Sequence, residues 1–138
     1  MGKSTVALIL LTRVFGTCHD PCVVEYNRGG HVAWFEQAAH AARAAQVQVI
    51  INGFCGSSCM TLASEARPYV CITPRAIFAY HRTNYGDPIP LGRDLDHWIR
   101  VRGGYPPFRG VPGRMSYDAA RAFWPTCGSR APEGLNEQ

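Results

Sequence analysis

The stretch "VQVIINGFCGSSCMTLASEA", residues 47–66, carries the strongest structural signal in the 138-residue chain. Its opening run "VQVII" is apolar and rich in β-branched residues, which predicts a buried strand. The glycines and serines of "GFCGSS" predict a turn, and "SSCMTLASEA" predicts a short helix that ends before Pro68. The sequence therefore predicts a strand that turns sharply into a helix, with small polar residues at the turn.

Strand and helix patterns alternate on both sides of this turn. Runs rich in β-branched and aromatic residues predict three more strands, and amphipathic patterns predict helices before and between them. The predicted strands are 22–27, 69–73 and 76–81, and the helices are 4–15 and 31–46. Such alternation is typical of an α/β fold with a mostly parallel sheet and crossing helices.

The second half of the chain has a different composition. Residues 84–114 hold half of the ten prolines and many glycines, and helices are predicted at 93–101 and 116–124. Residues 1–124 are predicted to form one domain, and residues 125–138 a loose polar tail. The run at residues 6–11 is too short to span a membrane and is read as part of a first helix or of a short signal peptide.

The charges of the chain exclude some partners. Only 17% of the residues are charged, the formal net charge is +4, and no basic run is present. A nucleic-acid partner is therefore not expected.

Six cysteines permit three interpretations. An even number in an exported protein predicts disulfides, and cysteines also serve as small buried apolar residues. A zinc site in "CHDPC", using Cys18, His19 and Cys22, is the third interpretation. Both cysteine pairs have C-x-x-x-C spacing and no C-x-x-C knuckle is present, so no metal is expected.

The ends of three predicted strands carry residues suited to acyl transfer. A serine nucleophile needs a base within hydrogen-bond reach and donors for the oxyanion that it creates. Ser57 stands at a helix start, His81 ends a strand, and Gly29 and Gly30 join a strand to a helix. Because parallel strands deliver their carboxyl ends to one edge of the sheet, these residues are expected to converge.

Other assignments of the same residues are open at this point. Ser58 is an alternative nucleophile, and Cys55 or Cys59 could serve as a thiol catalyst at the helix start. The small residues can also be required only for packing in a tight turn, and His81 can simply end a strand.

The ordered set of motifs resembles the Clp protease proteolytic subunit and the Clp/crotonase superfamily, most of all small periplasmic ClpP-like bacterial proteins. The motifs are the diglycine of "NRGGHV", the elbow "CGSSC" and the histidine that closes "AIFAYH". The later "RMSYDAARAFWP" is similar to the segment that follows the third catalytic residue of Clp proteases. The likeness covers residues 4–124.

The resemblance implies a role for each matching residue. Ser57 is expected to be the nucleophile and His81 its general base. The main-chain N–H groups of Gly30 and Ser58 are expected to form the oxyanion hole, with Gly29 shaping the turn. A peptide or protein substrate and no cofactor are implied.

Cys55 and Cys59 flank the elbow, and the resemblance implies a disulfide between them if the protein is exported. Bridged cysteines would place the protein in the periplasm or outside the cell, and free thiols would place it in the cytoplasm.

The sequence also departs from the family pattern. The first strand of the fold is missing, which leaves an open sheet edge that favours a homo-oligomer. No carboxylate occurs in "VPGR", where the third catalytic residue is expected, so Asp118, Asp94 and Asp96 are the candidates.

These observations predict a serine hydrolase, specifically a peptidase, that works through an acyl-enzyme. The alternative is a non-catalytic binding or assembly module on the same scaffold. A crotonase-type enzyme acting on coenzyme A thioesters ranks last, because no basic cluster is present for the phosphates of that cofactor.

Overall fold

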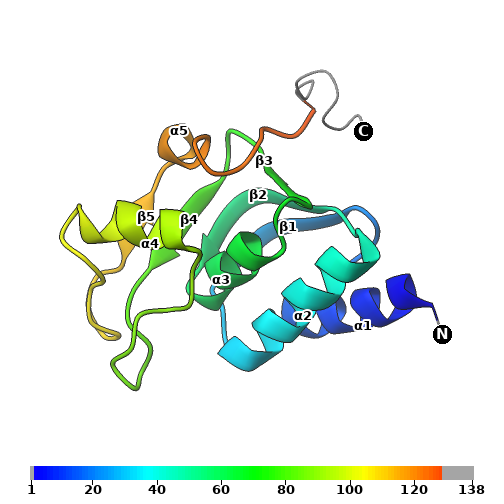
Figure 1. The fold of residues 1–138 in the computed structure, drawn as a ribbon, viewed down its shortest axis with the longest axis horizontal. Coiled ribbons are helices and arrows are strands. Elements are labelled where there is room, and N and C mark those ends of the chain that lie inside the picture. Colours follow the sequence, from blue (N-terminus) through cyan, green and yellow to red (C-terminus); the bar gives the residue numbers. More distant parts are fainter. Residues whose placement is uncertain (1, 129–138) are drawn as a thin grey trace.

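The computed structural model describes residues 2–128, which form a mixed α/β fold with an open five-stranded sheet and five helices (Figure 1). In chain order the elements are α1 Lys3–Phe15, β1 Cys22–Asn27, α2 Val32–Ala45, β2 Val49–Gly56, α3 Ser58–Glu65, β3 Val70–Ile72, β4 Ile77–Tyr80, α4 Arg93–Arg100, β5 Gly113–Met115 and α5 Tyr117–Ala120. The order of the first seven elements agrees with the pattern of the sequence.

Strand β2 is the centre of the sheet. It pairs in parallel with β1 on one side and with both β3 and β4 on the other. Strand β3 lies beside Val49–Ile51 and β4 lies beside Phe54–Gly56, so they act as one strand that is interrupted at Pro74. The predicted mostly parallel sheet is confirmed, and β5 adds one antiparallel strand next to β4.

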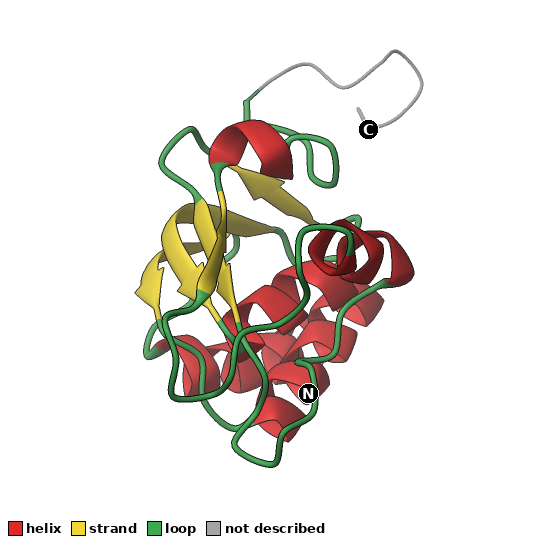
Figure 2. Ribbon diagram, turned by 90° about the vertical axis from the view of Figure 1, so that its left-hand side faces the viewer, coloured by secondary structure: helices red, strands yellow, loops and turns green. Residues whose placement is uncertain are grey.

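Helices cover one face of the sheet. Along β2, Val49, Ile51 and Cys55 are buried, whereas the alternate residues Ile50 and Phe54 are partly exposed. Helix α1 packs on α2 and contacts β1. Helix α3 also packs on α2 and contacts β2 and β4. Figure 2 shows the strands gathered into one twisted layer with the helices outside it. The apolar core therefore lies between this sheet and α1 to α3, and it continues to α4 and the α5 segment through Leu95, Ile99 and Trp124.

Three disulfides connect all six cysteines. They join Cys18 to Cys22, Cys55 to Cys59, and Cys71 to Cys127. The pairing of Cys55 with Cys59 that the resemblance implies is thus present. Because Cys18 and Cys22 are bonded to each other, they offer no thiolates to zinc, and within residues 2–128 no three His, Cys, Asp or Glu side chains are grouped to hold a metal ion.

The segment 125–127 is not the loose start of a tail. The N–H of Ile72 donates to the carbonyl of Pro125 at 2.9 Å, and the N–H of Cys127 donates back to the carbonyl of Ile72 at 2.8 Å. The Cys71–Cys127 disulfide fastens the same segment to β3. The ordered domain therefore extends past residue 124, and the rest of the predicted tail, 129–138, lies outside the described residues. None of the helices within 2–128 is long and apolar enough to cross a membrane.

Candidate active site

Ser57 lies at a strained turn between β2 and α3. Its backbone angles are φ 56° and ψ −126°, and it immediately precedes the first helical residue, Ser58. A positive φ is costly for any residue with a Cβ, and such strain is concentrated at functional sites. A strand that turns sharply into a helix at a serine also presents the hydroxyl at the edge of the sheet. The Ser57 side chain is half-buried, and its Oγ forms no hydrogen bond within residues 2–128.

Ser58 has a different environment from its neighbour. The residue is fully buried. Its Oγ accepts a hydrogen bond from the Gly30 N–H at 2.7 Å and donates one to the Gly30 carbonyl at 2.9 Å. The Ser58 hydroxyl therefore uses both its donor and an acceptor site on the Gly30 main chain. This favours Ser57 as the nucleophile of the two serines.

The two cysteines of the elbow are not available as nucleophiles. Cys55 and Cys59 are both fully buried and are bonded to each other. A thiolate is required for thiol catalysis, and a disulfide has none. The disulfide instead joins the end of β2 to the first turn of α3, on either side of Ser57.

The diglycine turn packs directly on the serine elbow. Gly29 has φ +90°, and a Cβ added there would lie 2.7 Å from the Gly56 carbonyl oxygen and 2.9 Å from the Ser57 Cβ. The N–H of Gly29 donates to the Asn27 side chain at 2.9 Å. Only glycine combines this conformation with this approach, so the structure brings Gly29 and Gly30 together with Ser57 and Ser58.

Ser57 and His81 follow neighbouring parallel strands. Gly56 at the end of β2 pairs with Ala79 of β4, and the Ser57 N–H donates to the Ala79 carbonyl at 2.9 Å. His81 comes two residues after Ala79 and is half-buried. The serine and the histidine therefore lie at the same edge of the sheet, as the strand pattern predicts.

The His81 ring is oriented by the main chain. Its Nδ1 lies within hydrogen-bond distance of the Arg82 carbonyl oxygen. A carbonyl only accepts, so Nδ1 carries a proton, and in the neutral ring the lone pair is on Nε2. The ring of Phe108 stands edge-on to the imidazole at 5.5 Å between centroids. A main-chain carbonyl thus selects the tautomer in which a histidine can act as a base through Nε2.

Two of the three candidate aspartates are held by other partners. Asp94 accepts two hydrogen bonds from Arg67, at 2.8 and 3.0 Å, which lower the pKa of its carboxyl. Asp96 accepts from Arg100 at 2.8 Å and from the Tyr105 hydroxyl at 2.6 Å, which lower its pKa as well. Within residues 2–128, neither carboxylate forms a hydrogen bond with the His81 imidazole.

The third candidate, Asp118, lies away from His81. Strand β5 runs antiparallel to β4, with Gly113 opposite Tyr80 at the histidine end. The chain then travels toward the other end of β4 before it reaches Asp118, which is exposed and lies 3.8 Å from Arg121. The structure therefore does not bring Asp118 to the imidazole.

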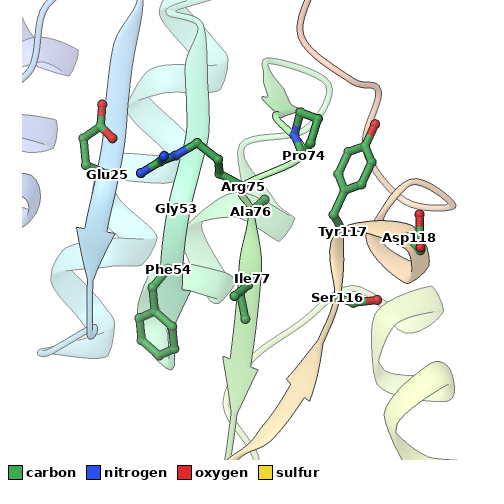
Figure 3. A pocket seen from close by; sticks show the side chains of 10 residues that line it. All are labelled: Glu25, Gly53, Phe54, Pro74, Arg75, Ala76, Ile77, Ser116, Tyr117 and Asp118. Carbon is green, nitrogen blue, oxygen red and sulfur yellow. The ribbon is translucent and has the colours of Figure 1, made fainter.

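Asp118 instead lines a groove of about 630 Å³ on the partly open face of the sheet (Figure 3). Its walls come from β1, β2, the start of β4 and the segment after β5. The lining residues are Glu25, Gly53, Phe54, Pro74, Arg75, Ala76, Ile77, Ser116, Tyr117 and Asp118. Neither Ser57 nor His81 lines this groove, so it is separate from the serine elbow.

No family model matches this chain, and a search of curated proteins finds no match. The described residues define a cysteine-rich α/β protein with an open, mostly parallel sheet.

Proposed function

We propose that this protein is a serine hydrolase of the Clp/crotonase type, in which Ser57 is the nucleophile and His81 the general base. The observation that carries the proposal is the strained main chain of Ser57, hydrogen-bonded to the strand that leads into His81. Glycine would adopt the same angles without this cost, so a serine at this position supports a role for its hydroxyl.

The chemistry follows from the orientation of the imidazole. The lone pair on Nε2 of His81 accepts the Ser57 hydroxyl proton as Oγ attacks a substrate carbonyl carbon. The carbonyl oxygen becomes an oxyanion, and the imidazolium then gives its proton to the leaving group as the bond to carbon breaks. A water molecule repeats the two steps on the acyl-enzyme and releases the acid, which regenerates Ser57.

The oxyanion would be stabilised at the start of α3. The N–H of Ser58 is one of the four N–H groups that a helix leaves without an internal partner, and the helix dipole favours negative charge there. The N–H of Gly30 is the second donor of the proposal, because Gly29 holds the diglycine turn against the elbow.

The three disulfides support a setting outside the cytoplasm. Disulfides persist in oxidising compartments and are rare in reducing ones. We therefore place the hydrolase in an exported location, with a peptide or protein as substrate. Strand β1 is an edge of the sheet, which favours pairing with a second copy of the chain.

A fluorophosphonate probe tests the proposal, because it forms a covalent adduct only with an activated serine. Labelling of the native protein, with the adduct mapped by peptide mass to Ser57, is expected. It should be abolished in Ser57→Ala and reduced about a hundredfold or more in His81→Ala. Ser4→Ala is the matched control, since Ser4 is exposed on α1.

Background labelling that is equal in all four proteins would contradict the hydrolase. That result would favour the alternative, a binding or assembly module that keeps the scaffold without the chemistry.

A further inference from the structure

The Gly30 N–H, which the proposed function uses for the oxyanion, already has an acceptor in this structure. It donates to the Ser58 Oγ at 2.7 Å, and the same hydroxyl donates to the Gly30 carbonyl at 2.9 Å. Ser58 is fully buried. The pair therefore forms a closed two-bond contact between the first helical residue of α3 and the diglycine turn, which we name the Ser58–Gly30 clasp.

The Ser58 oxygen and a substrate oxyanion compete for one hydrogen-bond donor, the Gly30 N–H. An N–H group has a single hydrogen, so the Ser58 oxygen and a substrate oxyanion cannot both accept a full hydrogen bond from it. While the clasp is closed, the Gly30 N–H is directed at the Ser58 oxygen and is not available to a substrate oxygen. The resting site is therefore short of one oxyanion donor, and a missing donor costs about a hundredfold or more in the rate of acyl transfer.

The surroundings of the two glycines allow the clasp to open. Gly29 is held in place, since a Cβ there would meet three atoms of the elbow within 3 Å and its N–H is bonded to Asn27. A Cβ on Gly30 would meet only the Phe35 ring, at 3.5 Å, and Gly30 is exposed. The turn is thus fixed at its first glycine and has room to move at its second.

We propose that Ser58 is a positioning residue that holds the Gly30 main chain in a resting arrangement, and that the clasp must open before the oxyanion hole is complete. This inference rests on the proposed function and adds a level of control to the same site. It gives the buried Ser58 hydroxyl a role that is distinct from those of the nucleophile Ser57 and the base His81.

The direction in which Ser58→Ala changes the labelling rate tests the proposal. Ser58→Ala removes the competing acceptor, so the rate of fluorophosphonate labelling at Ser57 is expected to rise by about two- to tenfold, the range that one net hydrogen bond represents. A merely structural role for the hydroxyl predicts the opposite, a slower rate.

Ser64→Ala is the matched control. Ser64 is also a buried serine of α3, and its Oγ accepts the N–H of Gly92 at 2.9 Å, toward the other end of the helix. The control is expected to leave the labelling rate unchanged within a factor of about two.

The amide resonance of Gly30 gives a readout that requires no variant, and its hydrogen exchange in the resting protein requires no activity either. In wild-type protein the Gly30 amide is expected to be protected from hydrogen exchange, and its chemical shift should move when Ser57 is phosphonylated, because the N–H changes acceptor. The Gly92 amide should not move. Rapid exchange of the Gly30 amide in the resting protein would overturn the clasp.

The outcomes separate the two proposals. Labelling of wild type with an equal or slower rate in Ser58→Ala keeps the hydrolase and overturns the clasp. Absence of labelling in both wild type and Ser58→Ala overturns the hydrolase, and the control role of the clasp falls with it. Labelling of Ser58→Ala that exceeds wild type supports both.

Discussion

The main-chain N–H of Ser57 donates a 2.9 Å hydrogen bond to the carbonyl oxygen of Ala79, two residues before His81. This bond continues the parallel pairing of β2 with β4 by one residue beyond Gly56. A sheet hydrogen bond therefore sets the position of the proposed nucleophile relative to the strand that carries the proposed base. Substitutions that disturb the Cys55–Cys59 elbow should therefore reduce labelling at Ser57 more than they reduce the stability of the fold.

Gly29→Ala is expected to destabilise the fold and to abolish labelling at Ser57. The new Cβ would lie 2.7 Å from the Gly56 carbonyl oxygen, at a φ of +90°. Overpacking and the positive φ together should cost about 3 kcal/mol in the free energy of unfolding, measured by urea denaturation. Gly86→Ala separates the two causes, because Gly86 has φ +93° but open space around it, and it should cost about 1 kcal/mol with normal labelling. Equal costs for the two variants would contradict the close approach.

The Cys71–Cys127 disulfide should matter more for stability, and the Cys55–Cys59 disulfide should matter more for labelling at Ser57. Cys71 and Cys127 are separated by 56 residues in the chain, so the pair restricts the unfolded state most, by about 4 kcal/mol on the chain-entropy relation. Cys55 and Cys59 are separated by four residues, and their bond should contribute about 2 kcal/mol.

The short pair nevertheless brackets the strained Ser57. A Cys55→Ala/Cys59→Ala protein should therefore lose most of its labelling while it unfolds at a higher urea concentration than Cys71→Ala/Cys127→Ala. The latter, tested well below its unfolding transition, should label at nearly the normal rate. A normal rate in the first variant would show that the disulfide does not support the elbow.

The neutral form of His81 should carry its proton on Nδ1. The Arg82 carbonyl accepts from that nitrogen, which leaves Nε2 unprotonated. Long-range nitrogen–proton correlation spectra above the titration range should show a protonated Nδ1 and an unprotonated Nε2 for this ring. The exposed His19 serves as a comparison. A protonated Nε2 on neutral His81 would remove the base from the proposed mechanism.

Asp94 should affect stability and leave labelling unchanged. Hydrogen bonds from Arg67 lower the pKa of Asp94 in the folded state below its ordinary value. A lowered pKa contributes stability above the unfolded-state pKa, and that stability is lost as the pH falls through the folded-state pKa. Asp94→Asn should therefore melt at a lower temperature than wild type near pH 7, and the difference should shrink toward about pH 2.

The matched control is Asp118→Asn, whose carboxylate is 88% exposed and pairs only loosely with Arg121. Its melting temperature should stay close to that of wild type at both pH values. A large loss of labelling in Asp94→Asn would instead point to a catalytic role for that carboxylate.

Local patterns in the sequence predict most of the elements. Apolar periodicity and turn residues place the two long helices and the strands around the elbow, because these signals come from near neighbours in the chain. Strand β5 was not predicted, since three residues of "GRM" in a glycine- and proline-rich loop carry no alternation. Its position is set by pairing with β4.

The candidate site divides in the same way. The sequence identifies Ser57, His81 and the diglycine as chemically suited residues. It provides no means to find that the Arg82 carbonyl orients the imidazole, since that bond depends on the ring rotamer. The aspartates are candidates by residue type and, for Asp118, by its place shortly after "VPGR". The fold pairs Asp94 and Asp96 with arginines and places Asp118 at a separate groove.

By itself the sequence determined the alternation of strands and helices and the sharp turn at residues 55–58. These follow from side-chain periodicity and glycine placement, which act over a few residues. Only the tertiary structure decided that Cys71 pairs with Cys127, that Ser58 is clasped to Gly30 and that Gly29 touches Ser57. Each of those contacts joins residues 28 or more positions apart, and distances of that kind are set by the packing of the whole sheet.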